Sequence, residues 1–202
     1  MSDSARLRAR YLEILREKSL TIGNFTLTSG QKSSYYFDAK ITTLDPEGAY
    51  LGALLLLELI REQELHADAI GGLTLGADPI VAAVAALSYA EREQFQPLQA
   101  FIARKEAKGH GTGRRIEGFK GKVGSPVFVI DDVCTTGGST LKAIQAAERE
   151  GFQVVAVFCL VDRQQGAAQL LADYPFYSIV AADELLAAPE VQRQLRALEV
   201  TD

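Results

Sequence analysis

Residues 127–140 constrain the fold of this chain more than any other part of the sequence. The stretch begins with four apolar residues, three of them β-branched, which predicts a strand buried on both faces of a parallel sheet. Asp131 and Asp132 follow at the end of that strand, and open α/β sheets bind their ligands at the carboxyl ends of the strands. The stretch therefore predicts an α/β fold with a ligand site at these two carboxylates.

Residues 134–140 read Cys-Thr-Thr-Gly-Gly-Ser-Thr and lead into a helical pattern. Small hydroxyl and glycine residues at a helix start leave backbone N–H groups unpaired, and the helix dipole makes the same point attractive to phosphate. The neighbouring carboxylates suit sugar hydroxyls or a bound cation. The spacing is neither that of a P-loop nor that of a dinucleotide-binding turn. We expect a site for a sugar phosphate, the alternative being an ordinary strand–turn–helix with a solvated end.

Residues 104–118 concentrate cations and glycines and offer almost nothing to bury. Such a segment is typical of a mobile loop that becomes ordered only when an anion engages it. A solvated basic hairpin tip is the ordinary interpretation, but this loop follows a strand beside the expected phosphate site. We therefore interpret residues 104–118 as a closing lid.

Composition excludes several classes of function. A net charge of −5 argues against a general nucleic-acid binder, although a local basic loop can still hold phosphates. No apolar run approaches the length of a membrane span, and the N-terminus lacks the apolar core of a signal peptide. The two cysteines, Cys134 and Cys159, do not make a disulfide framework. We expect a cytoplasmic protein that binds neither nucleic acid nor membrane.

The rest of the chain alternates predicted strands and helices, which predicts a largely parallel central sheet with helices on both faces. Residues 22–38 predict a β-hairpin packed over that sheet. A short strand over residues 67–72 supplies glycines that, with Gly76, are expected to bring backbone N–H groups against an anion. We expect one domain over residues 1–202, with an N-terminal hood over about residues 1–45. Other strands are expected at 99–103, 154–160 and 176–180, and helices at 3–18, 45–65, 80–91, 183–187 and 190–198.

Four motifs, in this order, resemble the orotate phosphoribosyltransferase family of type I phosphoribosyltransferases. They are residues 25–30 with 34–37, residues 104–110, residues 127–140 and residues 162–164. The resemblance covers nearly the whole chain and implies the type I phosphoribosyltransferase fold. It also implies that the enzyme joins orotate to phosphoribosyl pyrophosphate (PRPP), giving orotidine 5′-monophosphate and pyrophosphate in UMP biosynthesis, with Mg²⁺ as the cofactor.

The resemblance assigns the catalytic role to Lys108, His110, Asp131 and Asp132. The two carboxylates are expected to contact the ribose hydroxyls and magnesium-bound water, and residues 135–139 the 5′-phosphate through backbone N–H groups. The full PRPP-binding set is Arg104, Lys105, Lys108, His110, Asp131, Asp132, Val133, Cys134, Thr135, Thr136, Gly137, Gly138 and Ser139.

For orotate, the resemblance assigns Tyr36, Phe37, Thr135 and Arg163. The planar fork of an arginine suits a carboxylate because it can bind both oxygens. The family also implies a homodimer in which Lys105 completes the site of the partner subunit.

The chain departs from the family pattern at two places where many members carry a lysine that contacts PRPP. One is Thr28, and the other is the loop at residues 72–76, which holds no cation. Three alternatives stay open at this point: a phosphoribosyltransferase for another base, a PRPP-sensing regulator built on the same fold, and a catalytically weak paralogue. The acidic composition and the lack of room before the hairpin for a DNA-binding extension disfavour the regulator.

Overall fold

The computed structural model describes residues 3–26, 32–105 and 115–199, and a six-stranded sheet forms its centre. The strand order is β5-β4-β3-β6-β7-β8, and every neighbouring pair is parallel except β4 and β5. The strands are β3 (Ala69–Leu73), β4 (Gln99–Ala103), β5 (Ile116–Glu117), β6 (Pro126–Cys134), β7 (Gln153–Asp162) and β8 (Phe176–Ala181). The predicted parallel sheet flanked by helices is confirmed.

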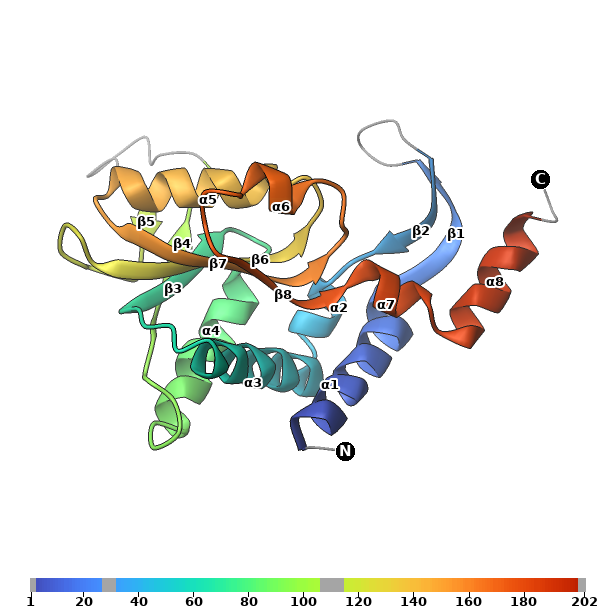
Figure 1. The fold of residues 1–202 in the computed structure, drawn as a ribbon, viewed down its shortest axis with the longest axis horizontal. Helices are drawn as coiled ribbons and strands as arrows, with labels where there is room; N and C mark the ends of the chain where they lie inside the picture. Colours follow the sequence, from blue (N-terminus) through green and yellow to red (C-terminus); the bar gives the residue numbers. More distant parts are fainter. Residues whose placement is uncertain (1–2, 27–31, 106–114, 200–202) are drawn as a thin grey trace.

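Helices cover both faces of the sheet, as Figure 1 shows, and β6 explains why. Its side chains alternate, so that Phe128 and Ile130 pack with helices α1, α3 and α4, whereas Val127 and Val129 pack with α5. All four are fully buried, and each contributes roughly 1.5–3 kcal/mol of hydrophobic stabilisation. The helices are α1 (Asp3–Ile14), α2 (Lys40–Thr43), α3 (Pro46–Glu62), α4 (Asp78–Ala90), α5 (Gly138–Arg149), α6 (Ala167–Leu170), α7 (Ala182–Leu186) and α8 (Pro189–Glu199).

The predicted N-terminal hairpin is a separate two-stranded antiparallel sheet formed by β1 (Leu20–Thr26) and β2 (Lys32–Phe37). A π-helical turn, η1 (Leu15–Ser19), joins it to α1. The hairpin stands beside the main sheet, near α7 and α8, instead of lying over the sheet's face (Figure 1). This position is a correction to the packing expected from sequence.

Long helix α3 shows how local sequence sets an element boundary. The Asp45 carboxylate accepts hydrogen bonds from the backbone N–H groups of Glu47 and Gly48, and Pro46 occupies the first helical position. Both features favour a helix start. Two short helices, α2 and α6, were not expected, because four-residue helices carry too little periodicity to be detected.

The end of the basic segment also differs from expectation. Residues 116 and 117 form β5, which pairs with β4, and the Ile116 side chain is buried. The segment therefore has something to bury at its far end. Residues 106–114 lie outside the described residues.

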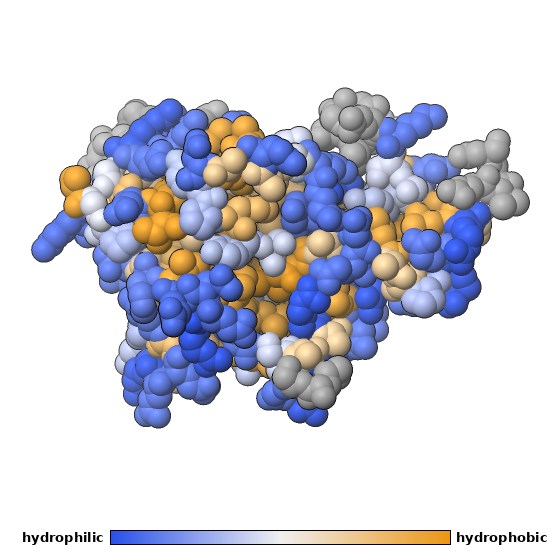
Figure 2. Space-filling model, in the orientation of Figure 1, coloured by the Kyte–Doolittle hydropathy of each residue, from blue (hydrophilic) through white to orange (hydrophobic). Residues whose placement is uncertain are grey.

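The surface in Figure 2 is mostly hydrophilic, with hydrophobic residues reaching it in strips between the charged ones. Within the described residues, no helix is long and apolar enough to cross a membrane.

Candidate functional site

Asp131 ties the end of β6 to the start of α5. Its Oδ2 accepts hydrogen bonds from Ser139 Oγ at 2.6 Å and from Thr140 Oγ1 at 2.9 Å, and Asp131 itself is only 6% exposed. Because charge-assisted hydrogen bonds are about twice as strong as neutral ones, this carboxylate holds the turn between strand and helix in place. The hydroxyl of Ser139 is engaged inside the protein, so only the backbone N–H of Ser139 is left for the predicted phosphate contact.

The turn itself is built to leave backbone donors open. Gly137 has a left-handed backbone (φ +82°), and no side chain caps the helix that begins at Gly138. The first N–H groups of a helix have no carbonyl partner within it, so this end presents donors and the positive dipole end together. Of the predicted PRPP-binding residues here, Thr136 and Ser139 are exposed, whereas Val133, Thr135 and Gly138 are half-buried.

Cys134, which the sequence assigned to PRPP binding, turns its side chain into the protein interior. Its Sγ lies 3.2 Å from Thr140 Oγ1, and the thiol is fully buried beside Cys159 and Ala167. Burial raises the pKa of Cys159 well above its ordinary value, with further contributions from Cys134 and nearby carboxylates. The Cys134 carbonyl oxygen accepts from the Arg163 N–H at 2.8 Å, so neither the thiol nor this oxygen is left for a ligand.

Asp132 differs from its neighbour, because no hydroxyl side chain donates to it among the described contacts. Its Oδ1 accepts from the backbone N–H of Val133 at 2.8 Å. Burial, and then the charge of Asp131, raise the pKa of Asp132 from 3.8 to about 6. This carboxylate is therefore held in an unfavourable charged state near neutral pH, which a cation or a hydroxyl donor would relieve.

The loop after β3 closes over both carboxylates. A Cβ placed on Gly76 would lie 2.7 Å from Asp132 Oδ1 and 3.3 Å from Asp131 Oδ1. Glycine is needed there because the backbone approaches the carboxylates so closely. Gly71 and Gly72, which the sequence suggested for anion binding, lie inside β3, where a Cβ would meet the Phe101 ring at 2.2 Å and the Ile130 carbonyl oxygen at 2.0 Å. Those two glycines serve packing.

Lys40 is a site cation that sequence reasoning missed. Its Nζ pairs with Asp38 Oδ1 at 2.7 Å, and this hydrogen bond is the largest cause that raises the pKa of Lys40. Charge attraction to Asp132 adds to that rise, and Lys40 in turn opposes the raised pKa of Asp132. Lys40 follows the hairpin directly, where no motif singles it out.

Arg163 joins the main sheet to the hairpin. Its Nε donates to Tyr35 Oη at 3.2 Å, and its guanidinium carbon lies 4.7 Å from the centre of the Tyr35 ring. Tyr35 was not among the predicted orotate contacts. The predicted pair, Tyr36 and Phe37, is split by the alternation of β2: Phe37 packs against the core, whereas Tyr36 is 47% exposed and contacts the Phe25 ring.

The predicted cations of the basic segment are only partly described. Arg104 pairs with Glu117 across β4 and β5 at 2.8 Å, and Lys105 is exposed. Lys108 and His110, the two predicted catalytic residues of this segment, lie outside the described residues, as does Thr28. Among the residues that are described, no three His, Cys, Asp or Glu side chains form a group able to hold a metal ion.

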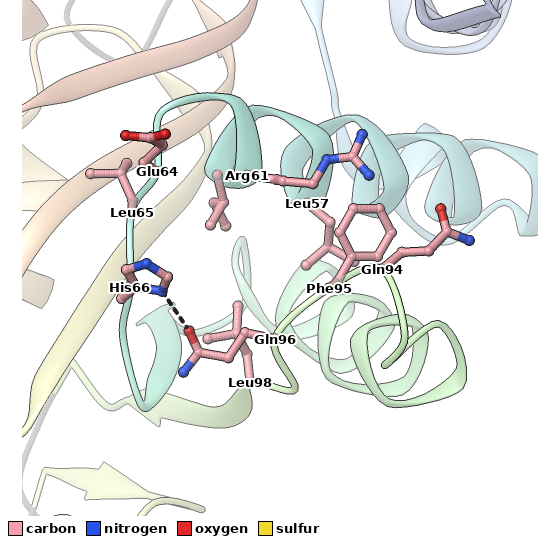
Figure 3. Close-up of a pocket in the computed structure, with 10 residues that line it drawn as sticks. Leu57, Arg61, Glu64, Leu65, His66, Gln94, Phe95, Gln96 and Leu98 are labelled. Carbon is pink, nitrogen blue, oxygen red and sulfur yellow. Dashed lines mark hydrogen bonds between the residues drawn. The ribbon is translucent and has the colours of Figure 1, made fainter.

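The molecule also has a separate cavity of about 460 Å³ (Figure 3). It is lined by the end of α3 and by the segments that precede β3 and β4. His66 Nδ1 and Gln96 Oε1 are 3.2 Å apart at one side of it, and the Arg61 guanidinium lies over the Phe95 ring. Because these segments precede the strands, the cavity opens at the opposite edge of the sheet from Asp131.

Comparison with known proteins identifies relatives over nearly the whole chain. The family described as "Phosphoribosyl transferase domain" matches residues 54–188. An orotate phosphoribosyltransferase of Rhodopseudomonas palustris (strain BisB5) is 44% identical over 191 residues, which cover 92% of this chain and 99% of the relative. The orotate phosphoribosyltransferase of Aquifex aeolicus is 42% identical over 184 residues, covering 89% and 97% of the two chains.

Solved structures that resemble this chain are also phosphoribosyltransferases. Mycobacterium tuberculosis orotate phosphoribosyltransferase in complex with PRPP matches with a TM-score of 0.72 and 33% identity, covering 89% of this chain and 98% of that one. Adenine phosphoribosyltransferase from Trypanosoma brucei, at 16% identity and a TM-score of 0.63, shares the fold.

Proposed function

The chain belongs to the orotate phosphoribosyltransferase family, and from that premise we propose that it transfers the phosphoribosyl group of PRPP to orotate. The observation that carries the proposal is the junction of β6 and α5. There, the carboxylates of Asp131 and Asp132 stand next to an uncapped helix start. A phosphorylated sugar needs acceptors for its hydroxyl groups next to N–H donors for its phosphate.

The proposed reaction breaks the bond between the anomeric carbon and the diphosphate oxygen, and pyrophosphate leaves with the bonding electrons. A ring nitrogen of orotate supplies the electron pair of the new bond. The protein must hold the sugar while positive charge develops on it and must stabilise the departing polyanion. We assign the sugar hydroxyls to Asp132, the 5′-phosphate to the backbone of residues 135–138, and the pyrophosphate to Arg104, Lys105, Lys108 and His110.

Mg²⁺ is part of this proposal. The donor set fits a cation held mainly by substrate oxygens and water, because the described residues offer no cluster of three metal ligands at the site. Asp132 is the carboxylate suited to such an ion, since burial and the charge of Asp131 raise its pKa to about 6 and Lys40 offsets that rise only in part. When bound, Mg²⁺ would neutralise part of the diphosphate charge.

For orotate, we propose Arg163 as the carboxylate partner, with Tyr36, Phe37 and Thr135 near the ring. The contact of Arg163 with Tyr35 supports this assignment, because stacking fixes the plane of the guanidinium while leaving its terminal nitrogens for a ligand. Tyr35 then acts as a positioning residue.

The test is the loss of orotate absorbance. Purified protein is expected to consume orotate only when PRPP and Mg²⁺ are both present. Adenine, hypoxanthine and uracil serve as competing bases. Equal or better turnover of any of them would refute the orotate assignment and leave the phosphoribosyltransferase assignment standing.

We further propose a homodimer in which Lys105 completes the partner's site, acting in the cytoplasm, where Cys134 and Cys159 stay reduced. Leu75 is 72% exposed beside the carboxylates, and Asp78 Oδ1 is buried with no hydrogen-bond partner among the described residues. Asp78 and Lys105 line the same pocket of about 570 Å³. A second subunit seated at this edge would cover the leucine.

Subunit mixing tests this arrangement. Dimers of Lys105→Ala and dimers of Arg163→Ala are each expected to be nearly inactive. In the mixed dimer, one site collects both defects and the other collects neither, so activity should return to about half that of the wild type. No recovery after verified exchange would mean that Lys105 serves its own chain.

A further inference from the structure

A pocket of about 580 Å³ beside α5 gathers five cations, and the proposed transfer reaction uses only two of them, Arg104 and Lys105. Its walls come from the ends of β3 and β4, from the residue before β5, and from one face of α5. Its lining residues are Leu73, Arg104, Lys105, Arg115, Ser139, Lys142, Gln145 and Arg149. Five of these carry a positive charge and none carries a negative one, although the whole chain has a net charge of −5.

The acids of the described residues compensate little of this charge. Arg104 pairs with Glu117 at 2.8 Å. In the part of the chain that the structure describes, no ion pair involves Lys105, Arg115, Lys142 or Arg149. The cavity of Figure 3 differs in this respect, because its lining includes one acidic residue, Glu64, as well as the cation Arg61.

Helix energetics explain only part of the cluster. Arg149 lies in the last turn of α5, where the negative end of the helix dipole favours a cation. Lys142 is the fifth residue of the same helix, on the side of its positive end, where a cation gains nothing from the dipole. Ser139, Lys142, Gln145 and Arg149 recur at helical spacing, so they line one face. A cluster arranged in this way is stabilised by an anionic ligand.

We propose that Arg115, Lys142, Gln145 and Arg149 form a second anion subsite that holds inorganic pyrophosphate next to the transferase site. The proposal rests on the proposed function in naming pyrophosphate, which is that reaction's product. Ser139, Arg104 and Lys105 connect the two sites, since they line the pocket and also belong to the predicted PRPP-binding set. Pyrophosphate has the charge and the several acceptor oxygens that three cations and an amide can bind at once.

The experiment is calorimetric titration of the full-length protein with sodium pyrophosphate at low ionic strength, with no orotate or PRPP present. Wild type is expected to show two classes of binding. Lys142→Ala/Arg149→Ala is expected to lose one class, or to weaken it at least about tenfold, because two charge-assisted contacts are removed. Alanine is the best helix former, so α5 should persist.

Arg193→Ala/Arg196→Ala is the matched control. It removes the same charge from exposed positions on α8, at the other end of the molecule from the β5 side of α5 (Figure 1). Its titration should match that of the wild type. Equal weakening in both double variants, or no weakening in Lys142→Ala/Arg149→Ala, would overturn the proposal.

Acetylation of lysines provides a second readout that needs no variant. Pyrophosphate is expected to slow acetic anhydride labelling of Lys142 several-fold and to leave Lys122, which is exposed elsewhere, unchanged. Equal labelling of Lys142 with and without pyrophosphate would contradict the subsite. Neither measurement depends on turnover, so a failure of the orotate assay would leave both results interpretable.

Discussion

Asp132→Asn is expected to stabilise the folded chain near neutral pH while removing most of its activity. The reason is the raised pKa of this carboxyl, which burial and the charge of Asp131 bring to about 6 from an ordinary 3.8. Asparagine has the same shape and keeps an oxygen for the Val133 N–H, but it carries no charge. The substitution therefore removes an electrostatic penalty with little change in packing.

The size and sign of the effect follow from proton linkage. Between pH 4 and pH 6 the folded Asp132 keeps a proton that the unfolded chain has already lost, so the free energy of unfolding falls as the pH rises through this window. A difference of about two units between the folded and the unfolded pKa lowers the free energy of unfolding by about 3 kcal/mol once the group is ionised in both states. About half of this, roughly 1.4 kcal/mol, develops between pH 5 and pH 8.

Urea unfolding of wild type and Asp132→Asn from pH 5 to pH 8 measures the difference directly. We expect the variant's advantage to grow with pH toward at most about 3 kcal/mol. Its turnover of PRPP and orotate should fall by about 10²–10³, as for loss of one preorganised transition-state contact. A pH-independent stability difference, or a variant less stable than wild type at pH 8, would refute the reasoning.

Asp131→Asn supplies the matched contrast. Asp131 accepts hydrogen bonds from two hydroxyls and from the Asp132 N–H. An amide at this position must turn its NH₂ group toward one of these donors. Leaving a buried donor unsatisfied costs about 1–3 kcal/mol, so this variant should lose stability at every pH where wild type folds.

Three further outcomes are expected. Gly76→Ala should fold but raise the KM for PRPP about tenfold or more. Its Cβ would lie 2.7 Å from Asp132 Oδ1, which is too close, so the carboxylate would have to move. Unchanged kinetics would mean that the loop backbone shifts at little cost and leaves the carboxylate in place. Tyr35→Phe, which loses the 3.2 Å hydrogen bond from Arg163 but keeps the ring, should weaken orotate binding only a few-fold, equivalent to about 0.5–1.5 kcal/mol, and Tyr35→Ala should weaken it further. Both cysteine thiols are fully buried, so Ellman's reagent should label them only after unfolding; fast labelling of the native protein would contradict their burial.

The sequence predicted the central strand, its helix and the residues between them because hydrophobic periodicity and turn chemistry are local signals. It failed where tertiary packing decides. Gly71 and Gly72 looked like loop glycines, but the Phe101 ring and the Ile130 carbonyl oxygen leave no room for a side chain at those positions. Ile116 looked like part of a loop, and only its pairing with β4 buries it.

The site shows the same division. Arg163 was predicted from its place at a strand end, but its partner Tyr35 lies 128 residues earlier in the chain, a separation that no local pattern spans. Lys40 was missed for the same reason, because its relation to Asp132 exists only after the hairpin has folded beside the sheet. Contacts between the hairpin and the main sheet are therefore the part of the site that required the structure.

The two adjacent aspartates show where strand parity adds information that residue type does not. Side chains along β6 alternate between the two faces of the sheet, and Val127 and Val129 face α5. The same parity turns Asp131 toward α5, where it meets Ser139 and Thr140. Asp132 shares the parity of Phe128 and Ile130, and no hydroxyl of the described residues donates to it on that side. Asp131 is consequently engaged in stabilising the turn. Asp132 is left with a raised pKa and with a charge that no hydroxyl donor stabilises, and a bound substrate or cation can provide that stabilisation.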